Sequence, residues 1–463
     1  MKRSPLLSFA AISLALCASA QAATRPAYGG TLRVESSASL SSLDPAQEGG
    51  LSADAGLRSK VASLLFDGLV RLDESGTVQP ALATSWRHDA DFRRWEFVVR
   101  EGVKMHNGSR LDPRLVVMSL AAANGAWKVR LAGNAVVVES ESPMPELLAE
   151  LARPRYSIVG RGIEGALIGT GPFRVAEFQP GKRLLLRANE DWWAGRPYAD
   201  AIEITFARSY RDQSIDLQAD RADVIEVSAD QARRAAQEGQ RLATSSPVEL
   251  LAIVFLPKVQ DQRVREAVSA AIDRASLHGI LLQKQGEPAA SLLPQWVSGY
   301  AFLFPTARNE AAPQPQRTGS SAQALTLAYD WSDTVAKSVA ERVAVNARDA
   351  GVTVQVFGEN LGNRPANADM RLVRVVLPSA RASVALAAMA ADLGYKEQAQ
   401  QIVAMTSPES LYSAERALLR DFVVVPLAYV PEVHALGPRV RNWVAPRQGG
   451  WPLENVSLVL EKP

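Results

Sequence analysis

The segment from Gly169 to Val227 constrains the fold most, because turns and alternating strands follow one another there in a definite order. Gly169 and Gly171 permit backbone angles that are closed to other residues, and Pro172 fixes the entry into the next segment. Apolar and polar residues then alternate on both sides of a turn at Gln179–Gly181, which predicts a hairpin followed by a third strand. The apolar positions of these strands are Phe173 and Val175, then Leu184 and Leu186, then Ile202, Ile204 and Phe206.

Four further markers follow the turn: Asn189, the pair Trp192–Trp193, Gly195–Tyr198, and Leu217–Val224. Together with the Gly-Thr-Gly-Pro-aromatic turn, this order resembles the large bacterial solute-binding proteins of ABC importers, family 5, which includes dipeptide-, oligopeptide- and nickel-binding proteins. Large aromatic side chains mostly supply buried area, so we expect the two tryptophans to pack in the protein rather than to stack on a ligand.

The resemblance extends over almost the whole chain. The matching segments are Gly29–Val34, Leu43–Pro45, Leu65–Val70, Pro80–Ala83, Ser85–Trp86, Trp95–Phe97, Arg100–Lys104, Arg263–Ala267, Ala270–Arg274, Val425–Leu427 and Val440–Trp443.

Length and composition agree with this family. A chain of 463 residues exceeds what one hydrophobic core usually organises, so two or more lobes are expected. Hydrophobic residues make up 47% and charged residues 22%, the balance of an ordinary globular protein.

The first 22 residues read as a cleavable secretory signal peptide, with a basic start, an apolar run and a small-residue cleavage site ending at Ala22. Removing Lys2 and Arg3 lowers Lys+Arg from 51 to the 49 that matches Asp+Glu, so no basic field for nucleic acid remains. Cys17 follows Leu16 rather than the small residue of a lipoprotein signal. We therefore expect a soluble, periplasmic mature protein that is not inserted in the membrane.

Several other elements can be assigned from periodicity. Helical spacing predicts one helix over 57–69 and another over 264–272 with Asp261 as its N-cap, and alternation predicts a strand over 95–99. A Pro-, Gln- and Ser-rich segment at 311–322 predicts a surface loop. The run from Leu325 to Val356 predicts a strand, a helix and a second strand, and therefore a parallel sheet in a separate lobe.

The resemblance implies an α/β fold of the periplasmic binding protein kind (type II, large peptide-binding class), with two lobes joined by a hinge. Lobe one would comprise residues 23–246 and 437–463, including an accessory region at about 70–165 that is shorter than is usual in the family. Lobe two would comprise residues 247–436. The chain crosses twice between the lobes, and we expect it to act as a monomer.

The resemblance also suggests ligand-binding positions. Gly49, Gly50 and Leu51 match a loop whose backbone bonds an extended ligand. Lobe two departs from the family pattern, because the strand beginning at Asp369 continues with Arg371, Arg374 and Val375 where peptide-binding members carry a Gly-Trp and then an acidic residue. If the two guanidinium groups point into the cleft, they would favour an anionic or capped ligand. Alternatively, they are solvated arginines on a strand edge.

Metal and catalytic sites are not indicated. The four histidines, at positions 88, 106, 278 and 434, are scattered without metal-ligand spacing, and His106 is expected to be structural. No nucleophile elbow, phosphate-binding loop or Ser-x-x-Lys motif is present in the sequence. We expect no cofactor, no resident metal and no enzymatic activity.

The predicted function is that of the periplasmic substrate-binding subunit of an ABC importer of the peptide/nickel class. It would capture a small-molecule or peptide-like ligand between two lobes and deliver it to the transmembrane permease subunits. Two alternatives remain open: a degenerate member that acts as a sensor or interaction module without transport, and a periplasmic enzyme on the same fold.

Overall fold

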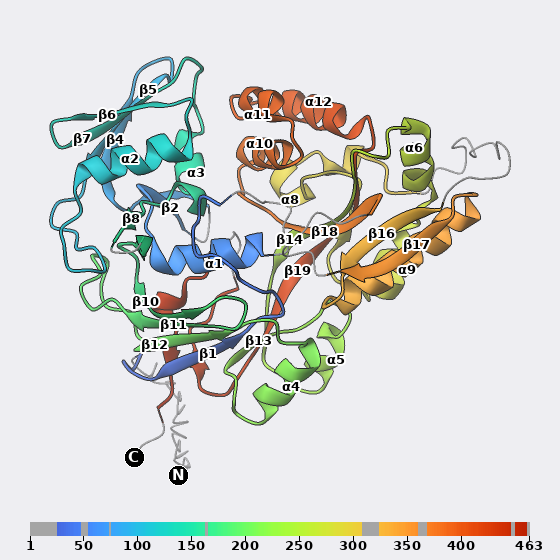
Figure 1. Cartoon of the computed structure of the whole chain (residues 1–463), viewed down its shortest axis with the longest axis horizontal. Coiled ribbons are helices and arrows are strands. Elements are labelled where there is room, and N and C mark those ends of the chain that lie inside the picture. Colours follow the sequence, from blue (N-terminus) through green and yellow to red (C-terminus); the bar gives the residue numbers. More distant parts are fainter. Residues whose placement is uncertain are drawn as a thin grey trace, which may run out of the picture.

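The chain folds into two lobes, which lie side by side in Figure 1. A cleft lies between them. The computed structural model describes residues 26–47, 54–73, 76–162, 165–307, 324–359, 368–445 and 450–460. The proposed signal peptide, the Gly49–Leu51 loop and the 311–322 loop lie outside these residues. Among the described residues, no helix is long and apolar enough to cross a membrane.

One large mixed sheet runs through both lobes. Its strands are ordered β10-β11-β12-β1-β13-β19-β14-β18-β16-β17, with the short β15 (Glu287–Pro288) beside β19. The strand bounds are β10 Phe173–Gln179, β11 Arg183–Ala188, β12 Ala201–Thr205, β1 Thr31–Glu35, β13 Val224–Glu226, β19 Val424–Leu436, β14 Leu242–Phe255, β18 Met370–Val376, β16 Leu325–Asp330 and β17 Val354–Glu359.

The two longest strands of this sheet, β14 and β19, join the lobes. They lie antiparallel to each other, and β19 pairs on its other side with β13, whereas β14 pairs on its other side with β18. Their ladder is irregular where Pro247 faces Pro431, with register shifts on both sides of this pair. Because proline has no backbone N–H, neither residue can donate a hydrogen bond to the ladder.

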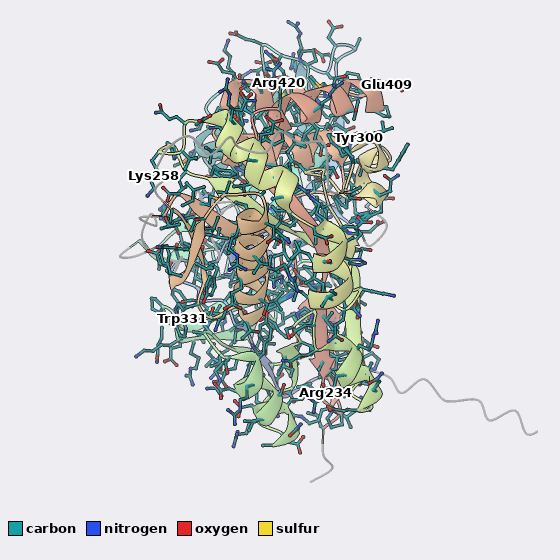
Figure 2. The ribbon with its side chains drawn as sticks, turned by 90° about the vertical axis from the view of Figure 1, so that its right-hand side faces the viewer. Arg234, Lys258, Tyr300, Trp331, Glu409 and Arg420 are labelled. Carbon is teal, nitrogen blue, oxygen red and sulfur yellow. The ribbon has the colours of Figure 1, made fainter. Side chains whose placement is uncertain are left out.

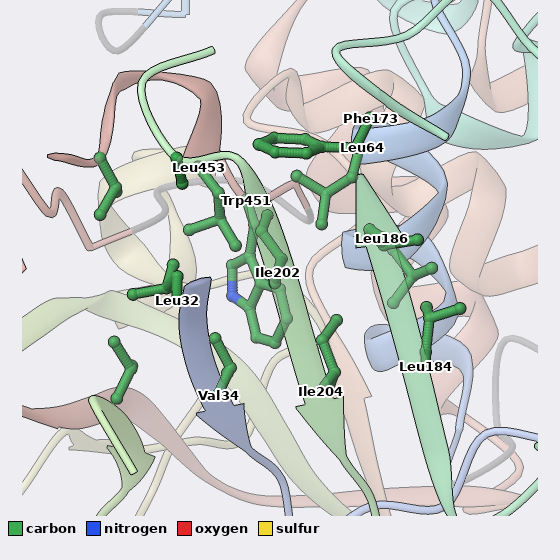
Figure 3. Close-up of a cluster of buried hydrophobic side chains, with 14 of the residues drawn as sticks. Leu32, Val34, Leu64, Phe173, Leu184, Leu186, Ile202, Ile204, Trp451 and Leu453 are labelled. Carbon is green, nitrogen blue, oxygen red and sulfur yellow. The ribbon is translucent and has the colours of Figure 1, made fainter. Parts of the chain in front are cut away.

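The predicted hairpin and third strand are confirmed. β10 pairs with β11 and β11 with β12, and a register shift between Val175 and Glu177 marks a bulge. On β11 and β12 every second side chain points into the core of lobe one, whereas on β10 Phe173 is buried and Val175, which was expected on the buried face, is 38% exposed. Figure 3 shows these side chains around the Trp451 ring, with Leu32 and Val34 from β1 and Leu64 from the helix that covers the sheet.

That helix, α1 (Ala55–Leu65), is shorter than the predicted 57–69 helix. It ends at Leu65, and Phe66 is already extended. The chain beyond it is held close to the turn at 169–171. A Cβ on Gly169 would lie 1.9 Å from the Leu65 carbonyl oxygen, and one on Gly171 would lie 2.5 Å from the Leu65 carbonyl carbon. Only glycine permits this approach, which is the physical reason for the Gly-Thr-Gly turn.

A smaller unit stands at the upper left of Figure 1. Its four-stranded sheet has the order β4-β5-β7-β6 and its own apolar core, in which the predicted strand at 95–99 is buried on alternate residues. Short strands β2 and β3 adjoin it, and β8 and β9 form a separate ribbon. The bounds are β2 Val70–Leu72, β3 Val78–Pro80, β4 Ala83–His88, β5 Arg94–Val99, α2 Pro113–Ala123, β6 Lys128–Ala132, β7 Ala135–Glu139, α3 Leu147–Leu151, β8 Gly160–Arg161 and β9 Leu167–Ile168.

Lobe two contains the predicted strand-helix-strand unit. β16 and β17 are parallel, and α9 (Thr334–Asp349) between them buries Val335, Val339 and Val343. The N-cap prediction is also confirmed, because Asp261 accepts a hydrogen bond from the backbone N–H of Arg263 at the start of α6 (Gln262–Ala271). Figure 2 looks onto this lobe, with Trp331 and Tyr300 labelled at different heights.

The remaining helices pack around the sheets, and α10 and α11 also border the cleft between the lobes. These remaining helices are α4 Tyr210–Gln218, α5 Ala232–Gln237, α7 Arg274–Ser276, α8 Gln295–Ser298, α10 Ala382–Asp392, α11 Lys396–Ile402 and α12 Pro408–Leu419, with the terminal strands β20 Val440–Arg441 and β21 Ser457–Leu458.

Candidate functional site

A cleft of about 1380 Å³ lies between the lobes and is the candidate ligand site. α1 and the smaller unit border it on one side, and β18 and α10 border it on the other. Its floor is the central part of the large sheet, where β13, β19, β14 and β18 lie side by side. Ligand pockets usually have about 300–1,000 Å³, so this cleft is large enough for a small molecule or a short peptide.

The register of the central strands places charged side chains on one face of the sheet. Glu226 on β13 is directly opposite His434 on β19, and Glu432 lies two residues before His434 and therefore points to the same face. On β14, Glu249 points to the same face of the sheet as Leu251, and Leu251 is directly opposite Arg374 on β18. We call these five residues, Glu226, Glu249, Arg374, Glu432 and His434, the cleft floor.

Arg374 is held by two carboxylates of the protein. Its Nε donates to Asp333 at 2.5 Å and its Nη1 donates to Glu249 at 3.0 Å, and its side chain is 24% exposed. Burial alone would lower the pKa of Arg374, but the Asp333 and Glu249 carboxylates outweigh that effect and hold this pKa well above its usual value. The expectation of an anionic ligand assumed free guanidinium groups. For Arg374 that premise is wrong, because its charge is already balanced.

The other two lobe-two positions differ from each other. Arg371 is half-buried and borders the cleft. Val375 is 5% exposed, packs in the apolar core of lobe two and also borders the cleft; alternation along β18 places it on the same face as Arg371, opposite the face that carries Arg374. Beyond Arg371, β18 has no described strand neighbour on the side away from β14. The three loop positions at 49–51 lie outside the described residues, so the structure does not place them relative to the cleft.

Lys60 on α1 is the second buried cation at the floor. Its Nζ lies 2.8 Å from a carboxylate oxygen of Glu432, with both side chains less than a tenth exposed, and it sits 5.4 Å from the centre of the Trp451 ring. Burial opposes the charged ammonium, but Glu432, Glu249 and Glu226 raise the pKa of Lys60 above its usual value. Burial, partly offset by Arg374, raises the pKa of Glu249 to about 7.

His434 was not recognised from the sequence as a site residue. Its side chain is 2% exposed and borders the cleft, and neither ring nitrogen has a hydrogen-bond partner among the described residues. Burial lowers its pKa, so the imidazole is neutral. The Glu432-x-His434 spacing on an apolar strand was the available signal, since it places two polar groups on one buried face.

Trp192 and Trp193 pack within the protein, as expected from their large aromatic side chains. The indole N–H of Trp193 donates to the buried Asp67 carboxylate at 2.9 Å and that of Trp192 at 3.4 Å, and the Thr170 hydroxyl donates to the same oxygen at 2.8 Å. Trp192 also borders the cleft. These hydrogen bonds connect the turn at Thr170 and the tryptophan pair to Asp67, two residues after the end of α1.

His106 is structural, as expected. Its Nε2 lies 3.1 Å from the Gly171 carbonyl oxygen and its Nδ1 accepts from the Gly169 N–H at 3.3 Å. Burial lowers the pKa of His106 to about 4. Within the described part of the chain, no group of three His, Cys, Asp or Glu residues could hold a metal ion.

Comparison with known proteins identifies the class. Residues 77–371 match the profile of bacterial extracellular solute-binding proteins, family 5 Middle, and the chain belongs to this family. The relatives include the nickel-binding periplasmic protein of Escherichia coli, 25% identical over 64% of this chain and 66% of its own length. The di/tripeptide-binding protein 2 of Pseudomonas aeruginosa is also 25% identical, over 65% of this chain and 64% of its own length.

Solved structures show the same fold. The murein tripeptide binding protein MppA of Escherichia coli superposes with a TM-score of 0.77 at 18% identity, covering 94% of this chain and all of that one. NikA from Staphylococcus aureus, solved with a nickel-histidine complex, gives 0.77 at 16% identity over 93% of this chain and all of that one. In sequence, the alignments span about half to two thirds of the length of the curated relatives just described and of a nickel-binding protein from Staphylococcus aureus.

Proposed function

We propose that the protein is the substrate-binding subunit of an ABC importer and that it captures a small solute or peptide-like ligand in its cleft. The observation that carries this proposal is the position of the cleft, which lies between two lobes that share the large sheet, with the central strands β14 and β19 running through both. A ligand that contacts both lobes stabilises the closed arrangement by the difference between its affinities for the closed and open forms. Closure would then be the signal that the membrane permease recognises.

The rest of the proposal follows from the family. Lobe one would comprise residues 23–246 and 437–463 with the accessory region at about 70–165, and lobe two residues 247–436, so that the first boundary falls inside β14. The protein would be exported with cleavage after Ala22, act as a periplasmic monomer and have no enzymatic activity. The open edge of β18 beyond Arg371 would let the backbone of an extended ligand add to the sheet.

The test is native mass spectrometry of the protein purified without denaturation, followed by small-angle scattering of ligand-free and reloaded samples. A bound small molecule and a smaller radius of gyration on reloading are expected. A protein that carries no solute and does not compact with any solute of measured affinity would instead favour the sensor or interaction module.

A further inference from the structure

The cleft floor carries more negative than positive charge. Glu226, Glu249 and Glu432 of the floor, together with the adjoining Asp333, are faced by two paired cations among the described residues, Lys60 on α1 and Arg374. Arg58 adds nothing to this balance, because its guanidinium is paired with Asp54 at 2.8 Å on the same helix. Along the described lining of the whole cleft, acidic side chains also outnumber basic ones.

The carboxylates of the floor all bind groups of the protein, but they differ in whether the partner is a cation. Glu226 accepts from the hydroxyls of Ser36 and Ser37 and from the Ser37 N–H, and its charge has no cation within ion-pair distance among the described residues. Glu249 shares Arg374 with Asp333. Its raised pKa, about 7, reflects burial first and the nearby carboxylates Glu432 and Glu226 in addition.

A second, independent observation indicates that a ligand group binds at the cleft floor. His434 is almost completely buried at the border of the cleft, opposite Glu226, and both of its nitrogens lack partners among the described residues. A buried imidazole without hydrogen bonds costs free energy, because a buried polar group loses its bonds to water. A polar group supplied by a ligand would satisfy it.

We propose that the cleft floor binds a protonated amine or guanidinium group of the transported solute. Glu226, Glu249 and Glu432 supply the charge, and neutral His434 accepts one hydrogen bond. The inference rests on the proposed function and adds the chemical class of the solute. A cation fits where an anion would not, because the four carboxylates share two cations and Glu226 has none within ion-pair distance among the described residues.

The test measures binding of putrescine and agmatine, with succinate as the matched dianion, by calorimetry. Saturable binding of an amine and none of succinate are expected. Glu432→Gln should weaken the amine at least about tenfold, the loss of a charged hydrogen bond. Lys60→Met should strengthen it by a similar factor, because it removes a competing ammonium. A structural role would instead move both variants in the same direction.

Two further proteins keep the result interpretable. The double variant Lys60→Met/Glu432→Gln removes both members of the ion pair, so no buried charge is left without its partner. It should bind the amine with an affinity near the original one, even if the single Glu432→Gln variant folds poorly. Glu238→Gln removes an exposed carboxylate paired with Arg234 on α5 and should change nothing. Succinate binding, no saturable amine binding, or single variants that shift together would overturn the inference. A co-purified neutral or anionic solute would do so too, while leaving the proposed capture function intact.

Discussion

Replacement of Arg374 by Met tests whether the cleft floor is an ion-pair network. The variant keeps most of the aliphatic stem but removes the guanidinium that bonds Asp333 and Glu249. Removing one partner of a fully buried pair costs about 3–5 kcal/mol. Here the side chain of Arg374 is 24% exposed and those of Glu249 and Asp333 are 19% and 13% exposed, so we expect a loss of about 2–4 kcal/mol in the free energy of unfolding. Urea unfolding at pH 8, followed by tryptophan fluorescence, measures it.

The pH dependence supplies a sharper criterion. Burial raises the folded pKa of Glu249 to about 7, so its charged form destabilises the protein increasingly as pH rises from the unfolded pKa of about 4.3. The charge of Arg374 counteracts the raised pKa of Glu249. Arg374 also lowers the pKa of Asp333, although burial alone would raise it, and this lowered pKa stabilises the protein above pH 4. The cost of Arg374→Met should therefore shrink by at least about 1 kcal/mol at pH 5, where Glu249 is protonated with or without Arg374.

The controls separate this network from general damage. Arg374→Met/Glu249→Gln, which removes the uncompensated glutamate, should recover part of the loss at pH 8. Arg234→Met at an exposed pair should change stability by less than about 0.5 kcal/mol. A cost for Arg374→Met below about 0.5 kcal/mol, or one that is larger at pH 5 than at pH 8, would refute the reasoning.

Three other outcomes are expected. Gly169→Ala should unfold or severely destabilise the protein, because its methyl would overlap the Leu65 carbonyl, whereas Gly125→Ala, which meets nothing within 4 Å, should be tolerated; thermal melting of the pair decides this. Asp261→Ala should cost about 0.5–2 kcal/mol in urea unfolding by removing the α6 cap. His106, with its pKa lowered to about 4 by burial, makes stability fall by up to roughly 3 kcal/mol as pH drops from 6.5 to 4, and His106→Gln should flatten that part of the pH profile.

Local chemistry explains which parts of the fold could be predicted. The hairpin beginning at Phe173 and the Asp261 cap depend on neighbours a few residues away, so alternation and capping rules sufficed. The α1 helix was predicted too long because Leu69 continues the apolar spacing after the chain has already turned at Phe66. Apolar periodicity reports burial and not the helix end.

The site was harder because its contacts join distant segments. Arg374 meets Asp333 and Glu249, which are 41 and 125 residues away, and no local pattern could reveal that its charge was balanced. Lys60 and Glu432 are likewise joined only by the docking of α1 on the sheet. Sequence placed Arg374 at the cleft but could not show whether its guanidinium was free.

The pairing of β14 with β19 has a mechanical consequence. Two separate linkers would let the lobes twist and slide relative to each other, but two strands that share one ladder resist such shear and permit bending chiefly about a single axis across the sheet. The ladder is weakest where Pro247 faces Pro431, and the indole of Trp296 anchors the Pro247 carbonyl from lobe two at 3.0 Å. The lobes would open and close by bending about one axis. In the proposed capture function, every closure would therefore give the same relative orientation of the lobes, whatever the shape of the ligand.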